Sequence, residues 1–262
     1  MNRLDPIVAA TREEVARRRE VVPPAALEEA AAARRAADDP VRGFAEALAR
    51  PGLSVIAEHK RRSPSAGLIR SDLALADVVG AYERGGASAL SILTEGPSFG
   101  GSLDDLRAAR AAAGLPLLRK DFIVDAYQVH ESFAAGADAI LLIVAALPAG
   151  ELSALHAEAL SLGLSALVEV HDVRELDIAL ALGAAVIGIN NRDLKTLEVD
   201  TARTFELLPR VAGQALLVSE SGFSRPAQLA ELARAGVDGV LIGEALMRSP
   251  DVEAACRQLA LR

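Results

Sequence analysis

From residue 53 onward, short runs of Val, Ile and Leu alternate with amphipathic stretches that have helical spacing. Buried parallel strands read as continuous apolar runs of this length, whereas a helix that covers a sheet has one apolar face. The pattern therefore predicts eight strands, at Ser54–Lys60, Ala87–Leu93, Pro116–Lys120, Ala137–Val144, Ser165–Val170, Ala185–Asn190, Ala215–Ser219 and Gly239–Gly243.

Eight helices are predicted to follow these strands, at Leu73–Arg84, Leu103–Ala113, Ala126–Ala135, Ala149–Leu162, Val173–Leu182, Ala202–Leu208, Pro226–Ala235 and Val252–Leu261. Glycine recurs at the joints from helix to strand, as in Ala135-Gly136-Ala137, which is typical of a helix that ends in a left-handed residue. Eight even strand-then-helix units close most naturally into an α/β fold of the (β/α)8 TIM barrel class. The alternative is an open doubly wound sheet, but no Gly-x-Gly-x-x-Gly turn follows the first strand.

Residues 1–52 have a different pattern, because they are helical throughout. A first helix is predicted to start at Asp5-Pro6 and to stop at Pro23-Pro24, with further helices at about 25–37 and 41–50. We expect an N-terminal helical extension at 1–52 that packs on a catalytic barrel at 53–262, the whole forming a single structural domain.

Composition narrows the class of protein. The formal net charge of −8 argues against a nucleic-acid surface, and one cysteine, Cys256, excludes an intramolecular disulfide. The longest apolar run, 139–147, is too short to span a membrane, and the first residues lack the apolar core of a signal peptide. We expect a cytoplasmic protein without nucleic-acid or membrane partners.

Candidate chemistry gathers at the predicted strand ends, which share one rim of a barrel. In the first strand, a period of two places Glu58 and Lys60 on one face with Ile56. Taken alone, such a pair is more often a surface ion pair. Other strands end in the same way, however, with Lys120, Glu169, Asn190 and Glu220. Mixed charges in one cluster are typical of an active site, because neighbours shift their proton affinities apart.

The last two strands end in small residues, at Ser221-Gly222 and at Gly243-Glu244-Ala245. In barrels these two loops often bind phosphate through backbone amides. Each is by itself an ordinary glycine turn, so the prediction depends on their paired position. Positive charge for an anionic ligand is expected from Lys60, Arg61, Arg192 and Lys195.

No metal site is predicted, because the four histidines, His59, His130, His156 and His171, lack ligand spacing. His59 is expected to pack behind the first strand. A Ser-His-Asp arrangement is also not expected, since no strand-end serine has a strand-end histidine beside it.

Five motifs together resemble the indole-3-glycerol-phosphate synthase family, in the order in which that family carries them. They are Glu58-His59-Lys60-Arg61-Arg62-Ser63-Pro64-Ser65, Leu118-Arg119-Lys120-Asp121-Phe122, Val168-Glu169-Val170-His171, Gly188-Ile189-Asn190-Asn191-Arg192-Asp193-Leu194 and Ser219-Glu220-Ser221-Gly222. The resemblance covers nearly the whole chain. It implies a lyase of tryptophan biosynthesis that converts 1-(2-carboxyphenylamino)-1-deoxyribulose 5-phosphate to indole-3-glycerol phosphate, with loss of carbon dioxide and water.

The resemblance also implies roles for the strand-end residues. Lys120 is the expected general acid of ring closure, and Glu169 the base or the partner of developing positive charge. Lys60 is expected to hold the substrate carboxylate, and to act with Glu58 in the loss of water. Neither a cofactor nor a metal is expected, because the cationic nitrogen formed on ring closure is itself the electron sink for decarboxylation.

Binding residues follow from the same resemblance. The expected substrate-binding residues are Asn190, Glu220, Phe122, Pro64, Leu194 and Arg192, and the expected phosphate-binding residues are Ser63, Ser221, Gly222, Gly243 and Glu244. Glu244 stands where the family commonly has serine, so its contact is expected from the backbone amide. The expected partner is this phosphosugar-anthranilate substrate, and the expected assembly is a monomer or weak homo-oligomer.

Two alternatives remain open at this point. One is another phosphate-binding barrel, such as phosphoribosylanthranilate isomerase, whose acid–base pair is not expected to need two lysines on the first and third strands. The other is a barrel that binds a phosphosugar without catalysis. An assay for the appearance of an indole separates both from the synthase.

Overall fold

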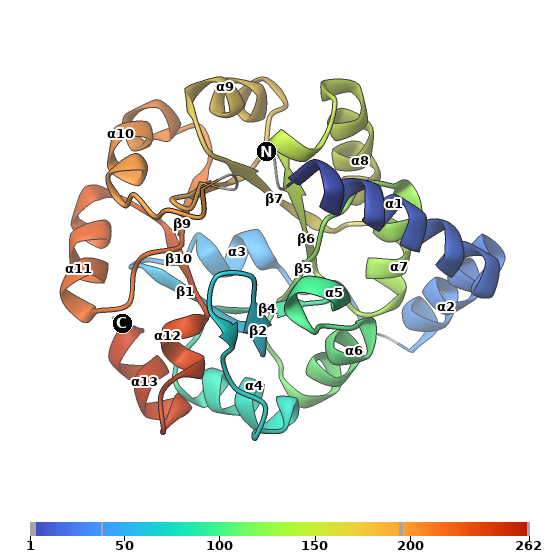
Figure 1. Cartoon of the computed structure of the whole chain (residues 1–262), viewed down its shortest axis with the longest axis horizontal. Helices are drawn as coiled ribbons and strands as arrows, with labels where there is room; N and C mark the ends of the chain where they lie inside the picture. The colour runs from blue at the N-terminus through green and yellow to red at the C-terminus, as the bar shows by residue number, and fades with distance from the viewer. Residues whose placement is uncertain (1–3, 38, 194–195, 261–262) are drawn as a thin grey trace.

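The computed structural model describes residues 4–37, 39–193 and 196–260. Its eight long strands are all parallel and form a closed barrel in the order β1-β10-β9-β8-β7-β6-β5-β4, which confirms the predicted fold (Figure 1). The barrel strands are β1 (Ser54–His59), β4 (Ala89–Leu93), β5 (Leu117–Lys120), β6 (Ala139–Ile143), β7 (Ser165–Val170), β8 (Val186–Asn190), β9 (Leu216–Glu220) and β10 (Gly239–Ile242).

Helices surround the barrel, and each strand is followed by at least one. The outer helices are α4 (Leu75–Arg84), α6 (Leu103–Ala112), α7 (Ala126–Ala134), α8 (Ala149–Ser161), α9 (Val173–Ala181), α10 (Ala202–Val211), α11 (Pro226–Ala235) and α13 (Val252–Leu259). The predicted end of α10 at Leu208 was wrong: the helix continues through Pro209, and its last residue, Val211, is fully buried. Burial of that apolar side chain offsets the hydrogen bond that the proline cannot donate.

Several short elements were not predicted. These are the hairpin of β2 (Arg62–Ser63) and β3 (Gly67–Leu68), the one-turn helix α5 (Gly96–Phe99), and the 3-10 turn η1 (Val144–Ala146). The hairpin follows β1 directly. Gly243-Glu244-Ala245 was expected to lead into a short helical turn, and this turn is α12 (Glu244–Met247).

Side chains alternate between the two faces of each strand, so the barrel wall has an apolar layer inside it and another outside it. Ile56 belongs to the cluster that fills the barrel, with inward residues such as Leu118 and Leu167. Its neighbours Val55 and Ala57 belong to the larger cluster between the strands and the outer helices. Because the inward positions continue to the strand ends, side chains two residues beyond this inner core face the open end of the barrel.

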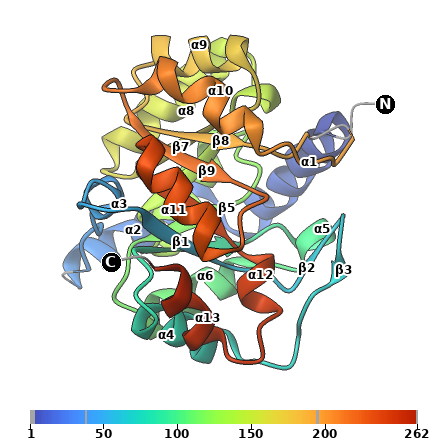
Figure 2. The ribbon, with the colours of Figure 1, turned by 90° about the vertical axis from the view of Figure 1, so that its left-hand side faces the viewer.

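The N-terminal segment contains α1 (Leu4–Val21), α2 (Pro24–Ala36) and α3 (Phe44–Leu48). Helix α2 packs on α7, and α1 lies against α7 and η1. Helix α3 is shorter than its predicted range and lies at one end of the barrel, opposite the β2–β3 hairpin and α5 (Figure 2). Phe44 and Leu48 join the inner cluster from there, so α3 closes the bottom of the barrel. The division at residue 52 into an extension and a barrel stays a prediction.

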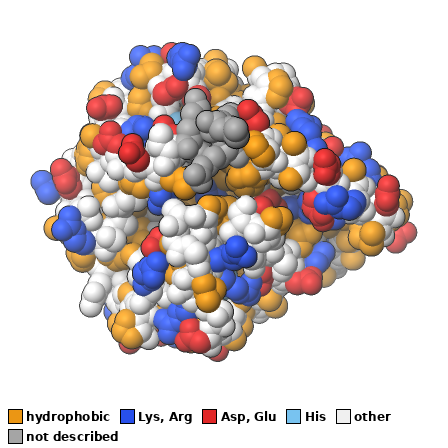
Figure 3. Space-filling view, in the orientation of Figure 1, with side chains coloured by type: hydrophobic (Ala, Val, Ile, Leu, Met, Phe, Trp, Pro, Cys, Tyr) orange, Lys and Arg blue, Asp and Glu red, His pale blue; other side chains and the backbone are white. Residues whose placement is uncertain are grey.

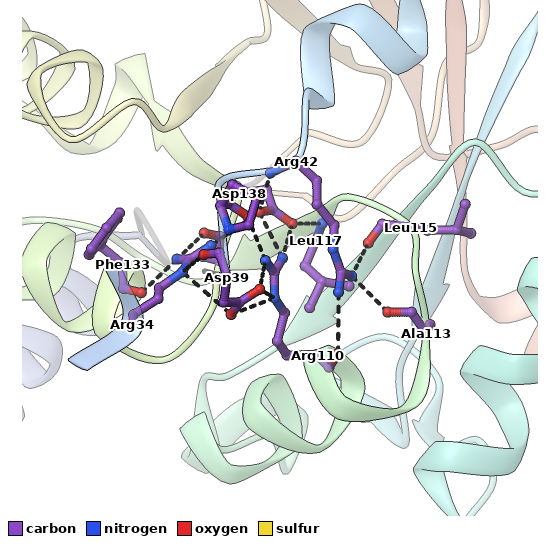
Figure 4. Close-up of polar contacts among 11 residues, drawn as sticks. Arg34, Asp39, Arg42, Arg110, Ala113, Leu115, Leu117, Phe133 and Asp138 are labelled. Carbon is purple, nitrogen blue, oxygen red and sulfur yellow. Dashed lines mark hydrogen bonds and ion pairs between the residues drawn. The ribbon is translucent and has the colours of Figure 1, made fainter. Parts of the chain in front are cut away.

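A buried ionic cluster ties this segment to the barrel (Figure 4). Asp138, which is fully buried just before β6, accepts hydrogen bonds from Arg110 Nη1 at 2.9 Å and from Arg34 Nη2 at 3.3 Å. It also accepts one from the backbone N–H of Arg42 at 2.8 Å. Arg110 pairs in addition with Asp39. One carboxylate of the barrel therefore holds three parts of the chain.

No helix within the described residues is long and apolar enough to cross a membrane. Acidic and basic side chains are interspersed over the face seen in Figure 3, which looks onto the open end of the barrel.

Candidate active site

The carboxyl ends of the strands surround a cavity of about 690 Å³, a volume that suits a small organic ligand. Residues at the carboxyl ends of all eight barrel strands line the cavity. Among the residues predicted as site residues, its lining includes Glu58, Lys60, Lys120, Phe122, Glu169, Asn190, Arg192, Glu220, Ser221, Gly222, Gly243 and Glu244. Residues that are as much as 186 positions apart in the chain thus meet at one rim.

Lys120 lies at the centre of the charged cluster. Its Nζ is 2.9 Å from Glu169 Oε2 and 2.8 Å from Glu220 Oε2. The two glutamate side chains are only 2% exposed, and Lys120 is 14% exposed. An ammonium shared by two desolvated carboxylates stays charged: burial acts to lower the pKa of Lys120, but Glu169 and Glu220 outweigh burial and raise it.

The two glutamates differ in their proton affinity. Burial raises the pKa of Glu220 to about 7, against the opposing charge of Lys120. Burial acts in the same direction on Glu169, but Lys120 and His171 together hold its pKa well below the usual range. At neutral pH the site therefore contains one carboxylate and one carboxyl group that exchanges its proton, which is the arrangement that separate base and acid functions require.

Glu58 and Lys60 form a second pair on β1 and the residue after it. Lys60 Nζ lies 2.7 Å from Glu58 Oε1, and Ser91 Oγ donates to Glu58 Oε2 at 3.3 Å. A Cβ atom at Gly243 would lie 2.5 Å from Glu58 Oε1. Glycine is therefore required at the end of β10, because Glu58 occupies the space of a side chain.

Backbone amides line the cavity between β9 and α12. Ser221 has φ +66° and Gly222 has φ +95°, so two successive residues are left-handed. Serine rarely adopts this conformation, which costs on the order of 1–3 kcal/mol and is typical of functional turns. The Ser221 hydroxyl donates to Asn190 Oδ1 at 3.0 Å. Such a turn presents successive N–H groups, an arrangement that suits an anion.

Two described residues that were predicted as site residues do not line the cavity. Ser63 and Pro64 belong to the β2–β3 hairpin and its turn, and the Ser63 hydroxyl accepts a hydrogen bond from the Ala66 backbone. Leu194 lies outside the described residues, and Lys195 does too. Their predicted roles stay predictions.

Residues after β4 line the cavity although the sequence reasoning did not select them. Glu95 follows β4 and accepts hydrogen bonds from the backbone N–H groups of Ser98 and Phe99, at 2.7 and 3.0 Å. This cap holds α5, and Phe99 on it faces the cavity. Leu93-Thr94-Glu95 lies at the end of a predicted strand, as Glu58 does, so Glu95 could have been predicted from the sequence in the same way.

Two histidines lie beside the motif residues. His59 is buried on the outer side of β1, as predicted, and burial together with the charge of Arg61 lowers its pKa to about 4. His171 instead contacts Glu169, with Nε2 3.3 Å from Oε1. No role was predicted for His171 from the sequence.

A second buried cluster fixes the end of β5 from the outer side. Arg119, fully buried, pairs with Asp121 at 2.8 Å and with Glu131 at 2.9 Å. Arg18 of α1 reaches the same Glu131 carboxylate at 2.6 Å. Because Arg119 precedes Lys120, these contacts restrict the backbone from which the Lys120 side chain enters the cavity. They also connect α1 to the end of β5.

Comparisons with known proteins agree with one another. A family model described as indole-3-glycerol phosphate synthase matches residues 4–259. The curated indole-3-glycerol phosphate synthase of Nocardioides sp. strain JS614 is 48% identical over 259 residues, which cover 99% of this chain and 98% of the relative. That of Polaromonas sp. strain JS666 is 47% identical over 256 residues, which cover 98% and 97%. Indole-3-glycerol phosphate synthase 2 of Streptomyces coelicolor is 52% identical over 212 residues, covering 81% and 82%.

Solved structures that resemble this one are more distant in sequence. Thiamine phosphate pyrophosphorylase from Pyrococcus furiosus matches with a TM-score of 0.60 and 17% identity, over 79% of this chain and 93% of the other. The 3-hexulose-6-phosphate synthase from Salmonella typhimurium has the same score with 14% identity, over 79% and 97%. At such identity the likeness shows the barrel fold alone.

Proposed function

The chain belongs to the indole-3-glycerol phosphate synthase family, and from that membership we propose how its residues divide the reaction. The protein is a carboxy-lyase of tryptophan biosynthesis. Its substrate is 1-(2-carboxyphenylamino)-1-deoxyribulose 5-phosphate, and the reaction comprises ring closure, decarboxylation and dehydration. The single observation that supports the proposed roles is the position of Lys120 between Glu169 and Glu220 inside the cavity.

Ring closure needs a proton at the ribulose carbonyl oxygen while the aromatic carbon bearing the carboxylate attacks the carbonyl carbon. We assign this proton to Lys120, whose ammonium is kept charged by two carboxylates. A positioned acid or base contributes about 10²–10⁴-fold to a rate. The same contacts orient the ammonium, which reduces the entropy that the reaction must lose.

Decarboxylation follows without another electron acceptor. After ring closure the nitrogen is cationic and conjugated to the carbon that carries the carboxylate, so the electrons of the breaking C–C bond pass to that nitrogen. Glu169, held ionised, either stabilises the developing cation or serves as a base. Lys60, which also lines the cavity, is proposed to hold the substrate carboxylate until it leaves.

Dehydration removes the new hydroxyl group as water and a proton from the neighbouring carbon. The pair of Glu58 and Lys60 suits this step, because their 2.7 Å contact joins a base to an acid. We propose that Lys60 protonates the departing hydroxyl and that Glu58 acts with it. The Lys60 side chain is 18% exposed and that of Glu58 4%, so bulk water competes little for either group.

The remaining lining residues bind the substrate. Asn190 and Glu220 are proposed to position the ribulose hydroxyls, with Arg192 nearby, and Phe122 forms an apolar wall for the anthranilate ring. The phosphate is assigned to the amides of Ser221, Gly222, Gly243 and Glu244. Pro64 and Leu194 are proposed as further walls of the ring pocket, and Ser63 as a further phosphate ligand.

The test of these roles is Lys120→Ala, followed by the ultraviolet or fluorescence signal of the indole product. We expect product formation to fall by at least about 10²-fold because the acid is lost, while calorimetry still detects substrate binding. The exposed Arg107→Ala is the matched control, since Arg107 pairs with neighbouring Asp104 on the surface, and it should keep full activity. Undiminished turnover in Lys120→Ala would remove the assignment, and no turnover in the unmodified protein would favour a phosphosugar-binding barrel.

We also propose a cytoplasmic location, because the reaction serves amino-acid biosynthesis, and a monomeric or weakly associating state. Fractionation and sedimentation analysis measure these two properties. Neither nucleic acid nor a membrane is a proposed partner, and the proposed chemistry uses no cofactor or metal.

A further inference from the structure

Two glutamates share one lysine in the cavity, yet their surroundings differ. Glu169 and Glu220 contact Lys120 Nζ at nearly equal distances and are equally buried. Glu220 Oε1 is buried and has no hydrogen-bond partner among the described residues. The corresponding atom of Glu169, Oε1, instead faces the imidazole of His171 at 3.3 Å. The difference between the two carboxylates therefore lies in this second partner.

His171 is held between two carboxylates. Its Nε2 faces Glu169, which lies two residues earlier, on β7. Its Nδ1 lies 3.0 Å from Glu175 Oε2 on α9. The same Glu175 oxygen accepts a hydrogen bond from the His171 backbone N–H at 2.8 Å. His171 Nε2 lies within ion-pair distance of Glu169 Oε1 but is buried without a hydrogen bond to a described residue. A neutral ring that donates Nδ1–H to Glu175 would turn the Nε2 lone pair toward the Glu169 carboxylate, so this position between two carboxylates favours the doubly protonated ring.

His171 stands behind the cavity and not in its lining. The lining includes Glu169 but neither His171 nor Glu175, and the histidine side chain is 12% exposed. The four side chains form a row, from Lys120 on β5 through Glu169 and His171 to Glu175 on α9. Charges alternate along this row, so each member is flanked by opposite charge.

We propose that His171 is a positioning residue. As an imidazolium fixed by Glu175, it keeps Glu169 ionised and oriented, and so leaves Glu220 as the carboxyl that exchanges a proton. The inference rests on the proposed role of Glu169 in the reaction. Helix α9 is then part of the site, because Glu175 on α9 keeps the imidazole ring of His171 charged.

Electrostatics agree with this geometry. Burial acts to lower the pKa of His171, but Glu169 and Glu175 outweigh it and raise the pKa to about 10. Glu175 from α9 and Glu169 from β7 are the charged groups that pair with the ring, and Lys120 from β5 lies beyond Glu169. Glu220, which lacks a histidine, has a pKa raised to about 7.

The experiment compares His171→Gln with the unmodified enzyme in kcat, KM and pH dependence. Glutamine keeps a polar group of similar length but carries no charge, so the pKa of Glu169 should rise. We expect kcat to fall about tenfold, KM to change less than about threefold, and the acid limb of the kcat profile to move up by about one pH unit. Glu175→Gln should cause a smaller shift in the same direction.

His130→Gln is the matched control, because His130 pairs with Glu158 on the surface, where both side chains are more than a third exposed. It should change neither kcat nor the pH profile. An unchanged acid limb in His171→Gln, with Glu169→Gln inactive, would overturn the inference and leave the proposed function intact. Full activity of Glu169→Gln would instead remove the role on which the inference rests.

Nuclear magnetic resonance of ¹⁵N-histidine in the unmodified protein provides a measurement that does not depend on activity. The His171 signals, assigned by their loss in His171→Gln or in the more conservative His171→Asn, should show two protonated ring nitrogens from about pH 6 to about pH 9. A neutral ring at pH 7 would overturn the inference.

Discussion

At the scale of single residues, the site depends on glycines, which leave space for the side chains of other residues. Glu58 occupies the space above Gly243, and Glu220 Oε1 occupies the space above Gly188 on β8, where a Cβ atom would lie only 2.3 Å away. Neither glycine has a left-handed φ. Their role is therefore to make room for buried carboxylates, which cannot move away because the inner cluster lies beneath them.

Gly188→Ala should therefore reduce kcat while the fold is retained. The new methyl group displaces the Glu220 carboxylate from Lys120, and a misplacement of about 1 Å costs on the order of 100-fold in rate. The measurement is steady-state indole formation, with circular dichroism as the check on folding. Gly150→Ala on α8 is the control, because a Cβ atom there has no neighbour within 4 Å, and it should leave activity unchanged. Equal activity of the two variants would contradict the steric account.

At the scale of elements, the turn of α12 brings opposite charges to the end of the cavity assigned to phosphate. Glu244 begins α12, and its carboxylate pairs with Arg248 Nε at 2.9 Å, one helical turn later. Both side chains line the cavity and are partly exposed. Arg248 compensates the negative charge of Glu244, and its partly exposed guanidinium lines the cavity where the phosphate is proposed to bind.

Removing the positive charge of Arg248 should weaken substrate binding. Arg248→Gln is expected to raise KM by roughly threefold with little change in kcat, because an exposed ion pair contributes less than about 1 kcal/mol. The effect should diminish at high salt, which screens exposed charges. Arg257→Gln, which breaks a similar pair with Glu253 on α13, is the control and should leave KM unchanged. A KM for Arg248→Gln that matches this control would refute the role.

The eight strands could be predicted to within two residues because each carries its own apolar run, and Ser165–Val170 agrees at both ends. The elements that were missed, such as the hairpin and α5, are too short to have a period. The lining residues were predictable from strand ends. The pairing of His171 was not, because it depends on where Glu175 lies across a turn and on Lys120 from another strand.

At the scale of the whole molecule, the barrel has two ends with different tasks. The open end contains the cavity, and the other contains α3 and the ionic cluster around Asp138 (Figures 2 and 4). In barrels of this class, chemistry is confined to the first end, and the second contributes stability. A substitution at Asp138 should therefore separate the two properties.

Asp138→Asn should destabilise the protein without changing its kinetics. The variant leaves Arg34 and Arg110 buried without their shared carboxylate, and breaking a buried pair typically costs 3–5 kcal/mol. Denaturant unfolding measures the loss, and kcat and KM at moderate temperature should stay as they are. The control is Asp104→Asn, an exposed partner of Arg107, which should change stability by less than about 1 kcal/mol. A stability loss no larger than that of the control would count against the cluster as an anchor.

The closure of the barrel between β1 and β10 has a consequence for biosynthesis on the ribosome. Ser54 pairs with Gly239, so the cylinder stays an open sheet with two free edges until β10 has been translated. The same segment delivers Gly243 to Glu58. A nascent chain thus gains its sealed wall and its working pocket in one event, and until β10 pairs with β1 its two edge strands expose unpaired backbone groups.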